Sequence, residues 1–247
     1  MLVQLIAHTN DPEKTIAAAA KLCYSDAHIE TLLDGLTPEK TTAFLQKLSD
    51  LGHASPIEHA SFTFGIEGVS RTFLAQVTRH RIASFSVQSQ RYVSYKDGFG
   101  YVVPPAIAAL GEDAAAEYRG QMAQMQQWYE EWQERLGTAG EKSNEDARFV
   151  LPGACETRIM LTMNARELRH FFALRMCSRA QWEIRALAES MFALCYKEVP
   201  ALFADAGPEC LRRGCPEGAK SCGRQAEMRA RREAFLRENQ PSGLAEA

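Results

Sequence analysis

The sequence lacks a long apolar run, since no segment approaches the roughly 18 uninterrupted apolar residues of a membrane-spanning helix. Its first residues, MLVQLIAHTNDPEK, also lack the basic and then apolar regions of a secretory signal. The seven cysteines are an odd number, which does not suit a framework of disulfides. We therefore expect a protein of the reducing cytoplasm with no membrane partner.

An excess of positive charge is missing as well. The 247 residues include 28 Lys and Arg against 31 Asp and Glu, which gives a net charge of -3. A protein whose whole surface binds nucleic acid is normally strongly basic, so we expect no nucleic-acid partner. With 46% hydrophobic and 24% charged residues, the composition excludes disorder and is typical of a folded enzyme.

Common metal and nucleotide motifs are absent: the sequence has no HExxH, paired CxxC, P-loop or Gly-rich dinucleotide fingerprint. A nucleotide would therefore be held by arginines and hydroxyl groups rather than by a Rossmann turn. Cys210, Cys215 and Cys222 could bind zinc with a fourth ligand from elsewhere, but their spacing matches no common zinc module. We favour free thiols there and expect no metal. The other cysteines are expected to be small core residues: Cys23, Cys155, Cys177 and Cys195.

Apolar periodicity and turn residues predict a few strands scattered between several helices. Strands are expected at residues 2–8, 60–68 and 157–163. Helices are expected at 12–23, 38–51, 70–81, 112–136, 144–152, 165–177 and 180–199, with Ser70 and Asn164 as N-caps. This mixture predicts an α+β fold, in which helices are combined with a small central sheet, antiparallel or mixed.

The composition of the chain changes near residue 205. Residues 1–204 contain the strand and helix patterns and are expected to form one domain. Residues 205–247 begin with a stretch rich in Gly, Pro and Cys and continue as the charged run RQAEMRARREAFLREN. We expect this part to be a Cys/Arg-rich C-terminal extension, either packed on the core or mobile.

Residues 79–91, RHRIASFSVQSQR, carry the strongest chemical signal, with three arginines, a histidine, three serines, two glutamines and no acid. Such a cluster repels itself unless an anion compensates it, and arginine forks with hydroxyls and backbone amides suit phosphate. On a helix, Arg79, His80 and Arg81 would point about 100° apart, which suits several ligands or a site built by several subunits. The alternative is a basic surface patch at a helix C-terminus.

Three further arginines, Arg148, Arg166 and Arg175, lie in apolar neighbourhoods. Arginine is seldom buried without a partner. On a helix, Arg166 and His170 share a face and Arg175 points about 180° away from Arg166, so one helix would serve two ligands. The carboxylates that could instead pair with these arginines are Glu145, Glu156, Glu167 and Glu183. Taken together with residues 79–91, the three arginines favour an anion site.

These residues resemble the family of flavin-dependent thymidylate synthases. Arg79-His80-Arg81, seven further residues, and then Ser89 and Arg91 match the signature of that family. Other blocks follow in the family's order: Gly52-His53, Ser55-Pro56, Glu58-His59, Arg148, Leu151-Pro152, Asn164-Ala165-Arg166, Leu174-Arg175 and Ala180-Gln181-Trp182-Glu183. The likeness covers about residues 1–204.

The resemblance implies reductive methylation of dUMP to dTMP, with methylenetetrahydrofolate as one-carbon donor, FAD as hydride carrier and NADPH as reductant. It also implies a homotetramer with active sites between subunits. The residues that it assigns to dUMP are Gln76, Arg79, Val87, Gln88, Ser89, Gln90, Arg91, Arg148 and Arg175. The residues that it assigns to FAD are His53, Ser55, Arg79, His80, Arg81, Asn164, Arg166 and His170. It further makes Arg175 catalytic, lying against the uracil and stabilising negative charge there.

The sequence departs from the family pattern at a few positions. Val87 and Gln88 stand where other members often have an acid and an apolar residue, and Arg179 stands where some have histidine. Local contacts to the nucleotide and the flavin are therefore expected to differ. We expect Ser89 to bind the nucleotide rather than to act as a nucleophile, because no base adjoins it in the sequence.

Other classes of function remain open at this point. A single-stranded RNA-binding module could stack bases on Phe85 and Tyr92 beside the basic segment, although the net charge disfavours it. Another flavoprotein that acts on a nucleotide or on tRNA would share the same anion site. A structural or regulatory protein is disfavoured, because it does not need an uncompensated basic segment.

Overall fold

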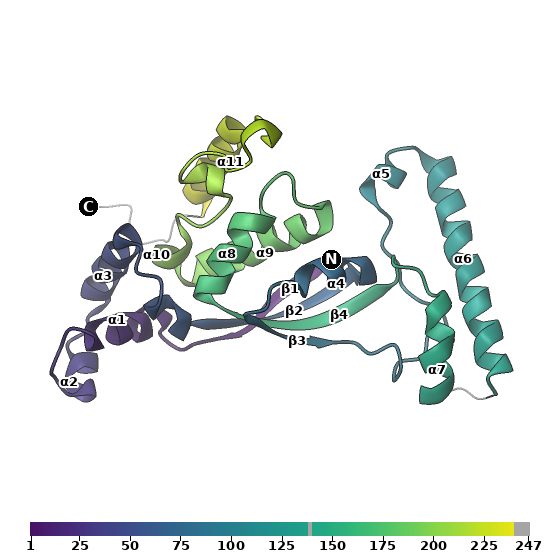
Figure 1. Ribbon diagram of the computed structural model, residues 1–247, viewed down its shortest axis with the longest axis horizontal. Coiled ribbons are helices and arrows are strands. Elements are labelled where there is room, and N and C mark those ends of the chain that lie inside the picture. Colours follow the sequence, from purple (N-terminus) through teal and green to yellow (C-terminus); the bar gives the residue numbers. More distant parts are fainter. Residues whose placement is uncertain (138–139, 240–247) are drawn as a thin grey trace. The chain divides into compact units, whose positions relative to one another are not determined.

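Four strands form one sheet in the computed structural model, which describes residues 1–137 and 140–239 (Figure 1). They are β1 (Leu2–His8), β2 (Ser61–Ser70), β3 (Ala83–Val87) and β4 (Glu156–Asn164), in the order β1-β2-β4-β3. The backbone bonds join the end of one strand to the start of its neighbour, as in Thr9 N–H to Ser61 O and Gln88 N–H to Arg158 O. The sheet is therefore antiparallel, which confirms the α+β class with a small antiparallel sheet.

The helices account for most of the remaining described chain. They are α1 (Pro12–Leu22), α2 (Ile29–Asp34), α3 (Pro38–Leu51), α4 (Arg71–Val77), α5 (Pro105–Ala108), α6 (Glu112–Arg135), α7 (Glu141–Ala147), α8 (Ala165–Arg175), α9 (Trp182–Glu198), α10 (Pro200–Phe203) and α11 (Gln225–Glu238). Short 3₁₀ turns are η1 (Pro56–His59), η2 (Arg148–Val150), η3 (Glu209–Leu211) and η4 (Gly218–Lys220). Among the described residues, no helix is long and apolar enough to cross a bilayer.

Both predicted N-caps are confirmed. The Ser70 hydroxyl oxygen accepts from the N–H of Phe73 at 3.1 Å, where α4 begins. The Asn164 side-chain oxygen accepts from the N–H of Glu167 at 2.9 Å, where α8 begins. Each cap satisfies a backbone donor that the first helical turn leaves without a partner, and so fixes where the helix starts.

Two helix predictions are wrong in their bounds. The helix expected over residues 70–81 ends at Val77, because residues 82–87 alternate as a strand and become β3. Arg79, His80 and Arg81 therefore lie in the turn before β3, and the angles expected for them on a helix do not apply. The helix expected to start at Asn144 starts three residues earlier, because this side chain points into a buried polar network instead of capping.

The chain divides into two compact units. Unit 1 comprises residues 1–2, 65–79 and 85–160; unit 2 comprises residues 3–64, 80–84 and 161 onward. The predicted division into residues 1–204 and 205–247 stays a prediction, and positions 240–247 of that extension lie outside the described residues.

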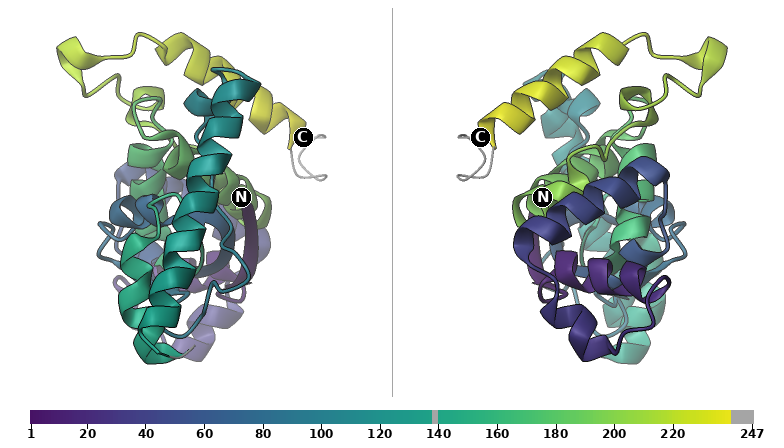
Figure 2. Two further views of the ribbon diagram at one scale, coloured as in Figure 1. Left: turned by 90° about the vertical axis from the view of Figure 1, so that its right-hand side faces the viewer. Right: turned by 90° about the vertical axis from the view of Figure 1, so that its left-hand side faces the viewer.

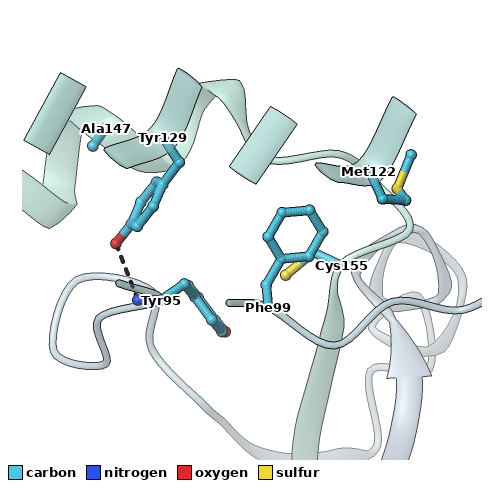
Figure 3. Close-up of a cluster of buried hydrophobic side chains, with 6 residues drawn as sticks. All are labelled: Tyr95, Phe99, Met122, Tyr129, Ala147 and Cys155. Atoms are coloured by element: carbon cyan, nitrogen blue, oxygen red, sulfur yellow. Dashed lines mark hydrogen bonds between the residues drawn. The ribbon is translucent and has the colours of Figure 1, made fainter. Parts of the chain in front are cut away.

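In unit 1, α6 and α7 pack against each other and cover an apolar cluster (Figure 3). The buried members of this cluster are Tyr95, Phe99, Met122, Tyr129, Ala147 and Cys155. The Tyr129 hydroxyl accepts from the N–H of Tyr95 at 3.3 Å and donates to the Asn144 side-chain oxygen, also at 3.3 Å. The Gln133 amide donates to the same Asn144 oxygen at 2.6 Å. Buried polar groups are satisfied in this way by partners from both helices.

In unit 2 the core is a chain of phenylalanines in edge-to-face contact. Phe172 of α8 contacts Phe192 of α9 with ring centroids 5.7 Å apart, and Phe203 of α10 at 5.9 Å. Phe203 in turn contacts Phe62 of β2 at 5.6 Å. In the same unit α1 and α3 run side by side, as Figure 2 shows in its right-hand view.

The described part of the C-terminal extension packs within unit 2. The two terminal nitrogens of the Arg169 guanidinium donate to the Asp205 carboxylate, at 2.6 and 2.7 Å. Helix α8 is therefore bonded to the start of the extension. The Gln225 side-chain amide at the start of α11 donates to the Cys210 carbonyl at 2.7 Å. Phe235 of α11 lies against Phe192 with ring centroids 5.2 Å apart. Of the two expectations, packing on the core describes these residues.

The buried amide of Asn144 gives a test of the fold of unit 1. Replacing it in Asn144→Ala removes the acceptor shared by Gln133 and Tyr129 and the donor to the Arg91 carbonyl, and should lower the free energy of unfolding by about 1–3 kcal/mol. Urea titration followed by circular dichroism measures the change. Gln121→Ala, on the exposed side of α6, is the control and should change the free energy by less than about 0.5 kcal/mol. Equal effects in the two variants would contradict a network that stabilises α6 against α7.

Candidate active site

The two predicted sets of binding residues fall largely into different units. Apart from Arg175, the residues assigned to dUMP belong to unit 1: Gln76, Arg79, Val87, Gln88, Ser89, Gln90, Arg91 and Arg148. Apart from Arg79, the residues assigned to FAD belong to unit 2: His53, Ser55, His80, Arg81, Asn164, Arg166 and His170. Sequence order alone gave no sign of this division, since Arg79 and His80 are neighbours in the chain.

In unit 1, the loop after β3 is held by its own hydrogen bonds. The Ser89 hydroxyl accepts from the N–H of Arg91 at 3.1 Å, and the buried Gln90 amide points at the Cys155 sulfur at 3.7 Å. Arg71 donates to the Gln88 carbonyl at 3.1 Å from the start of α4. Arg71 was not among the predicted site residues. Its position could have pointed to it, because it is a cation directly after the N-cap Ser70, at a helix N-terminus that disfavours positive charge.

Arg91 has carboxylate partners in the protein. Its guanidinium lies 2.7 Å from a Glu141 oxygen and 3.1 Å from a Glu145 oxygen, both on α7. The backbone carbonyl of Arg91 accepts from the Asn144 amide at 2.9 Å, so α7 holds this residue at three points. The expectation that residues 79–91 lack protein counter-charge is therefore wrong for Arg91. Arg148, which directly follows α7, donates from Nε to the Glu145 carbonyl at 3.0 Å.

Arg79 and Arg81 retain the uncompensated charge that the sequence predicted. Both side chains are exposed, and neither guanidinium makes an ion pair or hydrogen bond with a described residue of its own unit. The hydrogen bond at Arg79 is a backbone one, in which its N–H donates to the Gln76 carbonyl at 3.4 Å. An exposed arginine with no carboxylate beside it can grip an anion without first losing a partner.

In unit 2, a buried polar chain runs from Glu167 through His80 to Arg175. The His80 Nδ1 lies 2.8 Å from a Glu167 carboxylate oxygen, and its Nε2 lies 3.0 Å from the Arg175 Nε. Since a carboxylate only accepts and the Arg Nε only donates, His80 carries its proton on Nδ1 and accepts at Nε2. The imidazole is 5% exposed and packs edge-on against Phe171 with ring centroids 4.9 Å apart.

Burial is the largest cause that lowers the pKa of His80, and the positive charges of Arg175 and His170 lower it further. The hydrogen bond and the charge of Glu167 act in the opposite direction. The net result is a neutral imidazole at neutral pH, in agreement with its acceptor role toward Arg175. A protonated ring would confront Arg175 with a second cation and lose that hydrogen bond.

From the sequence, His80 was expected to bind FAD, which stays a prediction, and Glu167 was only a possible arginine partner. The structure places the two together, in contact with Arg175 through His80. Helical periodicity contained the signal, because Glu167 is four residues before Phe171 and so lies on the apolar side of α8. An acid on the core side of a helix requires a polar partner, and His80 is that partner.

The other residues assigned to FAD are near the surface of unit 2. His53 and Ser55 are exposed just before η1, and His170 is exposed on α8. Arg166 forms an ion pair with Glu58 of η1, and not with any of the four glutamates named from the sequence. The Asn164 side-chain oxygen is already the N-cap of α8, so any contact that this residue makes elsewhere uses its remaining polar groups.

The lowered pKa of His80 predicts a pH dependence of stability. In the unfolded chain His80 takes up a proton at about pH 6.5, whereas in the folded protein it does so only at lower pH. The contribution of the neutral ring to the free energy of unfolding is therefore complete above this pH and declines below it. His80→Gln keeps a donor and an acceptor but cannot titrate, and should lose less stability than the wild type between about pH 7 and pH 5. Urea unfolding at several pH values measures this. His28→Gln, a surface substitution, is the control; a parallel fall in wild type and His80→Gln would contradict the buried neutral ring.

Known proteins match this chain over most of its length. The family model described as thymidylate synthase complementing protein matches residues 4–201. The chain is 51% identical over 230 residues to a flavin-dependent thymidylate synthase of Geobacter sulfurreducens, which covers 93% of this chain and 97% of the relative. It is 47% identical over 237 residues to one of Clostridium tetani, which covers 92% and 95%.

A solved structure gives the same answer for the fold. The flavin-dependent thymidylate synthase of Helicobacter pylori, in a complex with FAD and dUMP, is similar to this chain with a TM-score of 0.60 and 26% identity. The match covers 84% of this chain and all of that one. Since both the family model and close relatives extend over the signature arginines and the buried chain that ends at Arg175, the protein belongs to the family of flavin-dependent thymidylate synthases.

Proposed function

We propose that this protein converts dUMP to dTMP by reductive methylation, with methylenetetrahydrofolate as one-carbon donor and NADPH as reductant. The observation that carries the proposal is the identity of 47–51% to thymidylate synthases of this kind over about nine-tenths of the chain. FAD is the cofactor, and when bound it supplies the hydride that completes the methyl group.

Unit 1 supplies the groups for dUMP in this proposal. Arg79 offers a guanidinium without an ion pair to any described residue of its unit, and Arg91 and Arg148 offer guanidinium groups whose positions α7 fixes in advance. Backbone and side-chain donors come from residues 87–90, in a loop whose Gln88 carbonyl accepts a hydrogen bond from Arg71. Paired N–H donors on several arginines suit a phosphate monoester better than a single ammonium would.

Unit 2 supplies groups that fit FAD, because exposed cations and histidines gather among the residues assigned to it. Arg81 has no carboxylate partner among the described residues of this unit, and Arg166 shares only the exposed Glu58. Exposed His53 and His170 add ring nitrogens that can donate or accept. This donor set suits the pyrophosphate of a dinucleotide. Arg81, Arg166, His53 and His170 would hold it, with contacts from Ser55, Asn164 and backbone groups around His80.

Arg175 would stabilise negative charge on the uracil as the ring is activated for methylation. Its Nε is fixed by His80, which sets the plane of the guanidinium before any ligand binds. A preset donor costs no reorganisation when charge develops, which is how such groups lower a barrier. Glu167 acts one step further back: it holds the Nδ1–H tautomer of His80 and is therefore a positioning residue rather than a catalytic one.

A homotetramer with active sites between subunits and a cytoplasmic location complete the proposal. Large apolar side chains are exposed on the single chain, among them Trp128 and Trp132 on α6 and Phe149 at 82% exposure. Association would cover such surface. All seven cysteines are free thiols, which suits a reducing compartment.

Arg175→Ala tests the catalytic assignment. The wild-type protein should be yellow when purified and should form dTMP from dUMP, methylenetetrahydrofolate and NADPH. The variant should keep its flavin spectrum and lose at least about a hundredfold in kcat, because a charge-stabilising donor is gone. A colourless wild-type protein, or one that is yellow but inactive on dUMP, would contradict the proposed function. Near-normal kcat in the variant would remove only Arg175 from the mechanism.

Glu167 gives a separate test of the positioning chain. Glu167→Ala should lower kcat about ten- to a hundredfold with the KM for dUMP within about twofold, since the residue acts through His80. Glu167→Gln keeps an acceptor for the Nδ1–H and should restore most of the loss. The tautomer of His80, read by ¹⁵N NMR, should change in the Ala variant and persist in Gln. Glu67→Gln, an exposed acid on β2, is the matched control. An unchanged tautomer in Glu167→Ala would sink the assignment.

A further inference from the structure

Four cysteines of unit 2 line one cavity. The cavity has a volume of about 330 Å³ and lies between the chain just after α8 and the segment from Pro208 to Met228. Cys177 enters it from the end of α8, and Cys210, Cys215 and Cys222 enter it from the C-terminal extension. Sequence analysis expected Cys177 in the core, but the structure places it half-buried at this cavity. The three cysteines of the extension needed a fourth ligand from elsewhere to bind zinc, and Cys177 of the same unit lines the same cavity.

We propose that Cys177, Cys210, Cys215 and Cys222 bind one Zn²⁺ ion, which ties the C-terminal extension to the loop after α8. Four thiolates are a complete tetrahedral ligand set for a closed, structural zinc site. Soft sulfur ligands of this number select Zn²⁺ over the harder cations Mg²⁺ and Ca²⁺. None of the four thiols is among the residues assigned to dUMP or FAD, and the role proposed for the ion is structural, although Arg175 also lines this cavity.

The four thiols lie near one another, since ionised Cys177, Cys215 and Cys222 would each act electrostatically on Cys210. Thiolates gathered in this way repel one another, and a divalent cation removes this repulsion.

Among the described residues, no three cysteine, histidine or acidic side chains already stand together as metal ligands. Binding would therefore require the thiols to move inward. The segment between Cys215 and Cys222 consists of short turns, such as Lys220 N–H to Glu217 O and Ser221 N–H to Gly218 O, with no long helix to break. Gly214 and Gly223 adopt positive φ values of 98° and 71°, which set the sharp turns on either side of the last two cysteines.

One contact already holds this segment to the loop after α8. Arg179 pairs with Glu217 and donates to the Lys220 carbonyl at 3.2 Å. Arg179 is the position at which the sequence departs from the histidine of some family members. The departure therefore has a role within unit 2: it brings the turn between Cys215 and Cys222 to the side of the cavity where Cys177 lies.

The metal content of the purified protein tests the proposal. The full-length chain, produced without a metal-affinity tag and kept under reducing conditions, should contain about one zinc per protomer by plasma mass spectrometry. Growth in cobalt should give thiolate-to-Co²⁺ charge-transfer absorption with the band shape of a tetrahedral site. Cys210→Ser and Cys222→Ser should each lose most of the metal. Cys23→Ser, which removes an exposed thiol at the end of α1, should retain it.

A variant that fails to fold would not decide the matter, so the wild-type protein is also titrated with a mercurial reagent. Zinc should be released after about four thiols have reacted, with the flavin spectrum and far-ultraviolet circular dichroism retained up to that point. No zinc, iron in its place, or a disulfide between any two of the four cysteines in protein purified without oxygen would overturn the proposal. None of these readouts depends on dTMP formation, so this proposal and the proposed function can fail separately.

Discussion

A guanidinium group cannot give up its proton near neutral pH, so a buried arginine needs a counter-charge or an acceptor from the protein, whereas an exposed one can be satisfied by water. Arg91 has two carboxylates, Arg166 has one, and Arg175 has the nitrogen of a neutral histidine. Arg79 and Arg81 have no carboxylate partner among the described residues of their units. The division into satisfied and unsatisfied arginines is the constraint on which the candidate site depends. Satisfied groups give fixed positions, and the others give uncompensated attraction for anions.

The buried chain of Glu167, His80 and Arg175 shows how a cation is oriented without being neutralised. A carboxylate directly on Arg175 would hold it, but would also cancel the charge that the proposed chemistry needs. A neutral imidazole between the two keeps the carboxylate one ring away. This arrangement requires the imidazole to remain unprotonated, and burial against Phe171 ensures that it does. Packing in the core of unit 2 thus determines the electrostatics at the end of α8.

Sequence patterns predicted strands β1, β2 and β4, the two N-caps and the long helix α6, because each depends on neighbours within a few residues. The family signature identified the candidate residues for the same reason. Partners that lie far apart in the sequence could not be predicted: Arg166 with Glu58, Arg91 with Glu141, and His80 with Glu167 are 50 to 108 residues apart. The end of α4 was also missed, since the strand tendency of residues 82–87 acts only through pairing with β4. Cys177 was assigned to the core because its helix is apolar, and the cavity beside it forms only when the extension folds back.

The two glutamates of α7 have a consequence for how an oxyanion reaches Arg91. Both pair with the same terminal nitrogen, Nη2, so a phosphate that bound there, as proposed, would replace one set of oxygens by another at this nitrogen. Such an exchange gains less energy than capture by a bare cation, and it leaves two carboxylates to be rehydrated. In return, a nucleotide that left this site would leave behind an arginine that the two glutamates of α7 can neutralise at once. Weaker retention of this kind would favour rapid release, which turnover needs more than tight binding.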